Sequence, residues 1–283
     1  MKTRLVACLM VLGLAGPNLF ASHKGQISPV EIASEDSSAV LQLEYWGEAG
    51  THPPHPIVVG TGFLIGREGY FVTAAHVLAR YKPNSPQLTA TTHQRDKNGI
   101  GVWFDVIEID RERDLALCQL KGFRPFKEPS GGTRPKLSYR PITSLRISEE
   151  SALAGEPIAI LGYPLGSFAS PVIQIGNIGA TDAMLETVPN FPAGRKDLLI
   201  VSVAGNHGDS GCPVISLTTG DVVGMLIQYV PAPLLSVGQG DSRQEVQQQS
   251  GLMVAVPAQW IMQMLTRHSV ANVAIMLKED LVM

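Results

Sequence analysis

The chain has little charge and few cysteines. Charged residues make up 17% of its 283 residues and the formal net charge is −3, so no electrostatic argument favours a nucleic-acid partner or an anionic membrane. Three cysteines are too few to define a disulfide scaffold. The sequence also lacks blocks of like charge and repeats with a period of about 20 to 50 residues, which excludes charged tails and solenoids.

The content of hydrophobic residues, glycine and proline indicates a folded chain with many turns. Hydrophobic residues account for 45% of the sequence, which excludes a disordered or collagen-like chain. The 28 glycines and 20 prolines are typical of proteins built from short strands and turns. The length allows one large domain or two small ones.

Long apolar runs are missing except near the N-terminus. Lys2 and Arg4 precede an apolar run over residues 5–15, and residues 19–22 (LFAS) offer a cleavage site after a small residue. The run is shorter than the about 20 residues that a membrane-spanning helix needs. We therefore expect a secretory signal peptide over residues 1–21, export to a periplasm or out of the cell, and no membrane span after its removal. An uncleaved anchor is the alternative.

Removal of the signal would leave two cysteines, Cys118 and Cys212. Two cysteines in an exported protein can form one disulfide. Cys118, however, lies within the apolar run 115–120, where a buried free thiol is ordinary. The sequence leaves both alternatives open.

Short segments that alternate or are rich in β-branched residues recur along the chain, bounded by turn-forming residues. In the first half these predicted strands are residues 40–46, 57–65, 70–73, 102–109 and 115–120. In the second half they are residues 157–161, 172–178, 198–203, 213–217, 222–229 and 252–256. Residues 74–81 predict one or two helical turns, and the polar, proline-containing residues 82–99 predict a long surface loop.

The polar stretch 121–140, with its lysines, prolines and glycines, predicts the boundary between the two halves. A second polar stretch, residues 236–250, is expected to be a mobile loop. The pattern predicts an all-β chain, divided into an N-terminal segment (22–39), a first half (40–135), a second half (136–256) and a C-terminal helix and tail (257–283) with Pro257 near the helix start.

Three short stretches carry residues suited to nucleophilic catalysis. The strand-like YFVTAAH ends in His76, the stretch RDLAL contains Asp114, and GDSG contains Ser210. Serine needs a neighbouring base to take its proton, and that histidine needs a carboxylate to fix its tautomer. The backbone amides of Gly208 and Ser210 would form an oxyanion hole. Each stretch alone is weak evidence for catalysis, but their joint presence in this order predicts a Ser-His-Asp triad.

Other chemistries fit the sequence less well. A lipase or esterase would carry Gly-x-Ser-x-Gly with its acid and histidine after the serine, whereas position 212 is cysteine and His76 and Asp114 come first. A cysteine protease on the same fold would place cysteine at position 210. His52 and His55 are separated by two prolines and have no third ligand, so we expect neither a metal nor another cofactor.

The sequence resembles a trypsin-like serine protease and, within that class, is most similar to the bacterial HtrA-type protease domain. The likeness covers roughly residues 57–265. The matching motifs are residues 61–65, 69–78, 114–117, 155–166, 208–211 with Asn206, 222–225 and 251–257.

This resemblance implies a chymotrypsin-like fold of two six-stranded antiparallel β-barrels with a C-terminal helix and a site in the cleft between the barrels. His76 and Asp114 would come from the first barrel and Ser210 from the second, with Asn206 supporting the nucleophile loop. The implied function is a serine endopeptidase that hydrolyses protein or peptide substrates through an acyl-enzyme. The alternative is a catalytically silent or latent binding protein on the same fold, and the oligomeric state is left open.

The sequence departs from the family pattern at several positions. HtrA proteins carry a PDZ domain after the protease domain, and residues 257–283 leave room for a helix and a tail alone, so we expect no PDZ domain. Cys212 replaces a common glycine and is expected to pack beneath the nucleophile loop. Ile227 stands where many relatives have a serine that supports the catalytic aspartate.

The residues of the substrate pocket are predicted only from their positions in the sequence relative to the family motifs. Ala204, six residues before the nucleophile, would form its floor, and Ile227, Gln228 and Tyr229 would line its wall. These residues favour small or medium apolar side chains before the scissile bond. His207 either touches substrate or is a solvated loop histidine.

Overall fold

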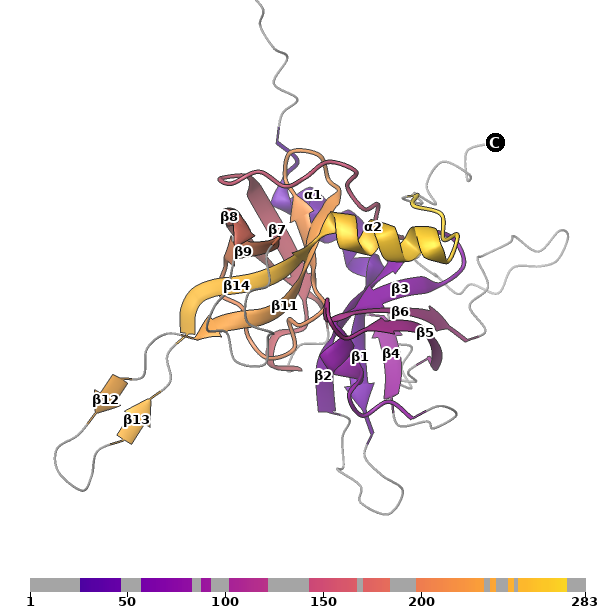
Figure 1. The fold of residues 1–283 in the computed structure, drawn as a ribbon, viewed down its shortest axis with the longest axis horizontal. Helices are drawn as coiled ribbons and strands as arrows, with labels where there is room; N and C mark the ends of the chain where they lie inside the picture. The colour runs from indigo at the N-terminus through magenta and orange to yellow at the C-terminus, as the bar shows by residue number, and fades with distance from the viewer. Residues whose placement is uncertain are drawn as a thin grey trace, which may run out of the picture.

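The computed structural model describes residues 26–46, 57–82, 88–92, 102–121, 143–166, 170–183, 197–231, 235–237, 244–246 and 249–273. The expected signal peptide, the His52–His55 stretch and the proposed boundary at residue 135 lie outside these ranges. The fold is mostly β, with two six-stranded antiparallel sheets and a C-terminal helix, which confirms the predicted class (Figure 1). Within the described ranges, no helix combines the length and the apolar character needed to cross a membrane.

The first sheet is a half-barrel. Its strands follow the order β4-β1-β2-β3-β6-β5, and an isolated backbone bridge pairs Ala90 of the edge strand β4 with Val102, two residues before the other edge strand β5. The bounds are β1 Val40–Tyr45, β2 Ile57–Ile65, β3 Tyr70–Thr73, β4 Leu88–Thr92, β5 Phe104–Asp110 and β6 Leu115–Leu120.

Strand β4 corrects the sequence analysis, which expected residues 82–99 to be a surface loop. The strand pairs antiparallel with β1, and its Leu88 and Ala90 are buried. Threonine favours extended backbone, and Thr89 and Thr91 are buried as well, so both faces of the strand are covered. The expected helical turn is present as the 3₁₀ helix η2, Ala75–Leu78.

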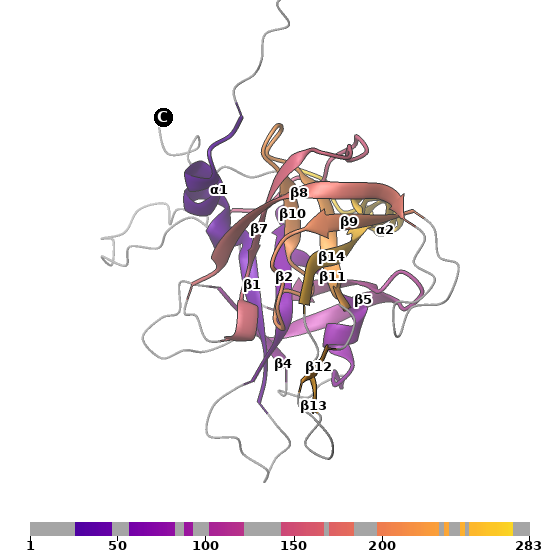
Figure 2. The ribbon, with the colours of Figure 1, turned by 90° about the vertical axis from the view of Figure 1, so that its left-hand side faces the viewer.

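The second sheet closes into a barrel in the order β10-β11-β14-β9-β8-β7. All six strands coincide with predicted segments, although several are longer. The bounds are β7 Pro157–Gly162, β8 Val172–Ala183, β9 Leu198–Ser202, β10 Pro213–Ser216, β11 Val222–Pro231 and β14 Gln249–Pro257. Figure 2 shows the strands β7 to β10 of this barrel above β4 and β5 of the first sheet.

The polar stretch 236–250 is not wholly a loop, contrary to expectation. It contributes to a hairpin in which β12, Leu235–Val237, pairs antiparallel with β13, Gln244–Val246. Figure 1 shows this hairpin standing away from the barrel, connected to β11 and β14. Its backbone groups pair with one another, which satisfies donors and acceptors that an isolated extended segment would leave to water.

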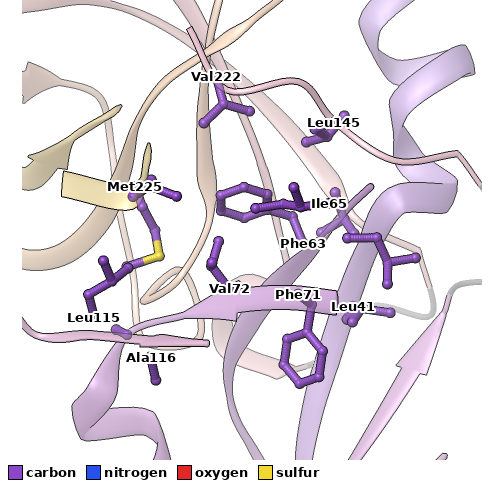
Figure 3. Packing of buried hydrophobic residues seen from close by; sticks show 14 of the residues in the cluster. Leu41, Phe63, Ile65, Phe71, Val72, Leu115, Ala116, Leu145, Val222 and Met225 are labelled. Carbon is purple, nitrogen blue, oxygen red and sulfur yellow. The ribbon is translucent and has the colours of Figure 1, made fainter. Parts of the chain in front are cut away.

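One apolar core joins the two sheets. Phe63 and Val72 of the first sheet belong to the same buried cluster as Val222 and Met225 of the second. Figure 3 shows Met225 lying beside Leu115, the first residue of β6. A separate cluster fills the interior of the closed barrel. Because the shared core fixes one sheet against the other, residues that lie on different sheets can be held in a constant relative geometry.

The helix α1, Pro29–Asp36, was not predicted within residues 22–39. Ser28 caps it by accepting a hydrogen bond from the amide of Val30, and Glu31 lies in its first turn. Proline is well tolerated at the first helical position, where no intrahelical amide bond is needed. The sequence Ser-x-x-Glu before a buried Ile32 is a capping signature that would have indicated this helix.

We expect Asp36→Asn to stabilise the protein above neutral pH. The pKa of the Asp36 carboxyl is raised from 3.8 to about 7, mainly by burial and further by Glu35 and Glu31. Because the folded pKa lies above the unfolded one, the contribution to stability is complete below 3.8 and is lost as the pH rises through about 7. The variant should therefore gain up to about 4 kcal/mol over wild type at alkaline pH, because each pKa unit corresponds to about 1.4 kcal/mol; urea unfolding measures the gain. Parallel stability profiles for the two proteins from acid to alkaline pH would contradict this account.

Candidate active site

His76 and Asp114 are brought together by two adjacent strands of the first sheet. His76 lies in η2 directly after β3, and Asp114 directly precedes β6, which pairs with β3. The distance from His76 Nδ1 to Asp114 Oδ2 is 2.7 Å, and the His76 backbone amide donates to Asp114 Oδ1 at 2.8 Å. The Ala75 amide donates to the Asp114 carbonyl at 3.1 Å. Three contacts therefore fix the carboxylate relative to the imidazole.

Asp114 holds this position in a left-handed backbone conformation. Its φ is +51°, a region that costs most non-glycine residues about 1–2 kcal/mol and that aspartate tolerates better than most. The Asp114 side chain is 15% exposed, whereas that of His76 is 48% exposed. The arrangement screens the carboxylate from water and leaves the imidazole open to a ligand.

The loop around Ser210 depends on two glycines with positive φ. Gly208 has φ +98° and Gly211 has φ +90°. The Ser210 carbonyl accepts from the Thr61 amide at 2.8 Å, and the Gly211 amide donates to the Leu226 carbonyl at 2.7 Å. The first of these bonds connects the loop to β2 of the first sheet, so both sheets support it.

The Ser210 hydroxyl donates to the carbonyl of Ile227 at 3.4 Å. Among the described residues, no hydrogen bond joins this hydroxyl to His76. Catalytic hydrogen bonds are often long or poorly aligned in enzymes without substrate and shorten in the substrate complex. The Ile227 side chain is buried in the shared core, so its contribution at this site is the backbone carbonyl.

Two backbone amides beside Ser210 remain available. The His207 carbonyl accepts from the Leu165 amide at 2.5 Å, and in a trans peptide the following N–H, that of Gly208, points the opposite way. The Gly208 carbonyl is held by the Thr61 hydroxyl at 2.7 Å. Among the described residues, neither the Gly208 amide nor the Ser210 amide donates to an acceptor. Two free donors near a hydroxyl are what a developing oxyanion requires.

Asp209 is buried beneath this loop and anchors it. Its Oδ2 accepts from the Asn206 amide at 2.9 Å and from Gln174 Nε2 at 3.3 Å, and Cys212 Sγ lies 3.7 Å from its Oδ1. Burial raises the pKa of the Asp209 carboxyl, an effect that the Asn206 and Gln174 hydrogen bonds oppose. The role of Gln174, which lies on β8, could not be predicted from the sequence because it depends on the barrel closing.

Cys118 and Cys212 are both free and buried, so the disulfide left open by the sequence is not formed. Burial raises the pKa of both thiols, and in Cys212 the charge of Asp209 adds to this effect. Cys212 packs beneath the nucleophile loop, as expected. The space for its sulfur exists because residue 162 is glycine, whose missing Cβ would lie 1.9 Å from Cys212 Sγ.

Gly162→Ala is accordingly expected to destabilise the protein by about 1–3 kcal/mol, the usual cost of overpacking a core. The new methyl group would clash with Cys212 Sγ and approach Asp209 Oδ1 to 2.9 Å. Combining it with Cys212→Ala should recover part of the loss, and a double-mutant cycle from urea unfolding measures this coupling. Strictly additive effects of the two substitutions would show that the predicted clash does not occur.

The predicted pocket residues are placed as follows. Ala204 is exposed, and Gln228 and Tyr229 are partly buried. The rings of His207 and Tyr229 meet edge-on with centroids 6.2 Å apart, joining the nucleophile loop to β11. Met253 was not predicted to lie beside this loop; its sulfur would lie 2.1 Å from a Cβ on Gly205.

In the portion of the chain with described structure, no group of three or more histidine, cysteine or acidic residues is placed to hold a metal ion.

Two antiparallel β-sheets with a histidine–aspartate pair on one and a glycine-flanked serine on the other define a trypsin-like arrangement. The model of the trypsin-like peptidase domain family matches residues 60–225, and the chain belongs to this family.

Individual relatives agree with the predicted likeness to HtrA-type proteases. The chain is 27% identical over 176 residues to the serine protease HTR4 of Rattus norvegicus, covering 62% of this chain and 30% of that protein. It is 25% identical over 168 residues to a probable periplasmic serine endoprotease DegP-like of Chlamydia pneumoniae, covering 59% and 28%. The matched region thus spans about a third of the length of these relatives.

The fold is also similar to a solved structure. An inactive form of the Rv3671c protease of M. tuberculosis aligns with a TM-score of 0.52, covering 83% of this chain and 91% of that chain at 19% identity. This likeness supports the chymotrypsin-like fold.

Proposed function

We propose that the chain is a serine endopeptidase in which Ser210 is the nucleophile, His76 the general base and Asp114 the residue that orients His76. The observation that carries this proposal is the double contact of Asp114 with the Nδ1 and the backbone amide of His76. A carboxylate bound to Nδ1 makes this atom the proton donor and leaves Nε2 as the acceptor that a general base needs.

The mechanism follows from these roles. His76 Nε2 takes the Ser210 proton as the hydroxyl oxygen attacks the scissile carbonyl, and Asp114 stabilises the imidazolium that forms. The Gly208 and Ser210 amides stabilise the oxyanion of the tetrahedral intermediate. His76 then returns the proton to the leaving amine, which leaves an acyl-enzyme on Ser210. A water molecule, deprotonated by His76, hydrolyses the acyl-enzyme and restores the hydroxyl.

The proposed substrates are proteins or peptides with a small or medium apolar residue before the scissile bond, based on Ala204 and its neighbours. We further propose that the chain is exported, because residues 1–21 have the pattern of a signal peptide and the relative from Chlamydia pneumoniae is named as periplasmic. Mass spectrometry of the N-terminus of the protein recovered from an expressing cell would test the cleavage.

One observation favours a second candidate, a latent or silent protein on the same fold. The Ser210 hydroxyl is bonded to the Ile227 carbonyl rather than to His76. If this state persisted, the serine would not be activated.

Hydrolysis of a fluorescein-labelled unfolded protein such as casein distinguishes the two candidates. The endopeptidase should release labelled fragments at a rate proportional to enzyme, and the Ser210→Ala variant should release none. Equal and negligible release by both folded proteins would reject the endopeptidase.

A further inference from the structure

Arg113, the residue before the candidate triad aspartate, is clamped by the C-terminal helix α2, Ala258–Arg267. Its guanidinium lies 5.3 Å from the ring centre of Trp260, and its Nη1 donates to Gln263 Oε1 at 3.1 Å. Arginine can stack on an aromatic ring while it donates hydrogen bonds at its edge, so both contacts are compatible. The Arg113 side chain is 33% exposed, which places the clamp at the edge of the protein rather than in its core.

The helix reaches Arg113 because it crosses from the second sheet to the first. Figure 1 shows α2 extending from the end of β14 toward the strands β3 and β6. Trp260, Gln263 and Arg267 follow the spacing i, i+3, i+7, so they share one face of the helix. All three contact residues of the first half of the chain, beside the buried face that the helix presents to the core through Ala258, Ile261, Met264 and Leu265.

A second anchor holds the far end of α2. Glu108 on β5 pairs with Arg267 at 2.5 Å and with His268 at 2.6 Å. These groups lower the pKa of Glu108, chiefly through the Arg267 hydrogen bond. Among the described residues, two polar anchors therefore attach the helix to the first half of the chain, and of these the Arg113 anchor is the one adjacent in the chain to Asp114.

The contacts of Arg113 bear directly on the backbone conformation of Asp114. Its φ of +51° is a strained conformation, and the carboxylate reaches both the ring and the amide of His76 from it. On its other side, the Arg113 amide donates to Asp110 Oδ1 at 3.0 Å, and the Asp110 carboxylate lies 3.8 Å from the guanidinium. Strained conformations persist where the surroundings over-determine them.

We propose that Arg113 is a positioning residue. Clamped by Trp260 and Gln263, it holds Asp114 in the left-handed conformation from which Asp114 orients His76. The inference rests on the proposed function, and it makes α2 part of the catalytic support rather than a C-terminal brace alone.

The test compares Arg113→Ala with Glu108→Gln, which removes the other anchor of the same helix. Arg113→Ala should lower kcat about 10- to 100-fold with little change in KM, the scale expected when a catalytic group is misplaced by a fraction of an ångström to an ångström. Arg113→Lys, which keeps the cation over Trp260, should recover part of kcat. Glu108→Gln should lower the melting temperature by a similar amount and leave kcat within about twofold of wild type.

A second measurement does not depend on activity. In ¹H NMR, the proton between His76 Nδ1 and Asp114 should give a far-downfield resonance in a Ser210→Ala background. This resonance should broaden or shift when Arg113→Ala is added and stay unchanged with Glu108→Gln. If Arg113→Ala lowers the melting temperature but leaves both kcat and this resonance as in the Glu108→Gln protein, Arg113 is merely structural and the inference fails. If the wild type has no activity, the proposed function fails while the NMR comparison still decides the role of Arg113.

Discussion

His76→Ala should reduce kcat on a protein substrate by about 10⁴- to 10⁶-fold, with KM changed little. The substitution removes the base that takes the Ser210 proton and the acid that protonates the leaving amine, so both halves of the cycle are affected. In the proposed mechanism Asp114 acts through this imidazole alone: it orients the ring and stabilises the imidazolium through a 2.7 Å contact. The residual rate would come from binding and the oxyanion hole alone. Steady-state kinetics with a fluorogenic peptide measure the loss.

The matched control is His268→Ala. His268 also lies close to a carboxylate, 2.6 Å from Glu108, but at the far end of α2. Loss of a histidine–carboxylate pair there should lower stability without a comparable fall in kcat. If His268→Ala and His76→Ala reduced kcat equally, the role of His76 as the base would be contradicted.

Gly208→Ala should lower kcat by about 10²- to 10³-fold, the usual cost of losing one oxyanion-hole donor. Alanine at this position meets two obstacles. Its φ of +98° disfavours any side chain, and the new Cβ would lie 2.2 Å from the Tyr163 carbonyl oxygen. Relief of the clash requires the peptide between His207 and Gly208 to move, which redirects the Gly208 amide.

Gly155→Ala is the control that separates the strain of a positive φ from the clash of the new Cβ. Gly155 has a similar φ of +86°, but a Cβ there would meet nothing within 4 Å. This control should lose stability through backbone strain and keep its kcat. Full activity in a folded Gly208→Ala protein would mean that the Gly208 amide does not serve the reaction.

The sequence predicted the second barrel well because each of its strands contains apolar residues, mostly valine, isoleucine or leucine, between turn residues. It missed β4 because LTATT is short, mostly threonine and flanked by polar residues, and its burial depends on pairing with β1. It missed α1 although Ser28 and Glu31 carry a capping signature. Local patterns therefore predicted the strands with high apolar content, tertiary pairing decided β4, and the local signal of α1 was overlooked.

The residues of the candidate site also differ in whether the sequence could predict them. His76, Asp114 and Ser210 could be proposed because their residue types and flanking motifs are local, and the structure brings the first two into contact. The groups that support them were not visible. Gln174 reaches Asp209 only when β8 closes the barrel, and α2 reaches Arg113 only when it folds back over the first sheet.

The central claim is that Ser210 is a serine activated by His76, and active-site labelling with a fluorophosphonate tests it most directly. The purified protein should take up one label per chain, located by mass spectrometry on Ser210. The folded Ser210→Ala and His76→Ala variants should take up none. A folded wild type that stays unlabelled, or a label that persists in Ser210→Ala, would contradict the claim.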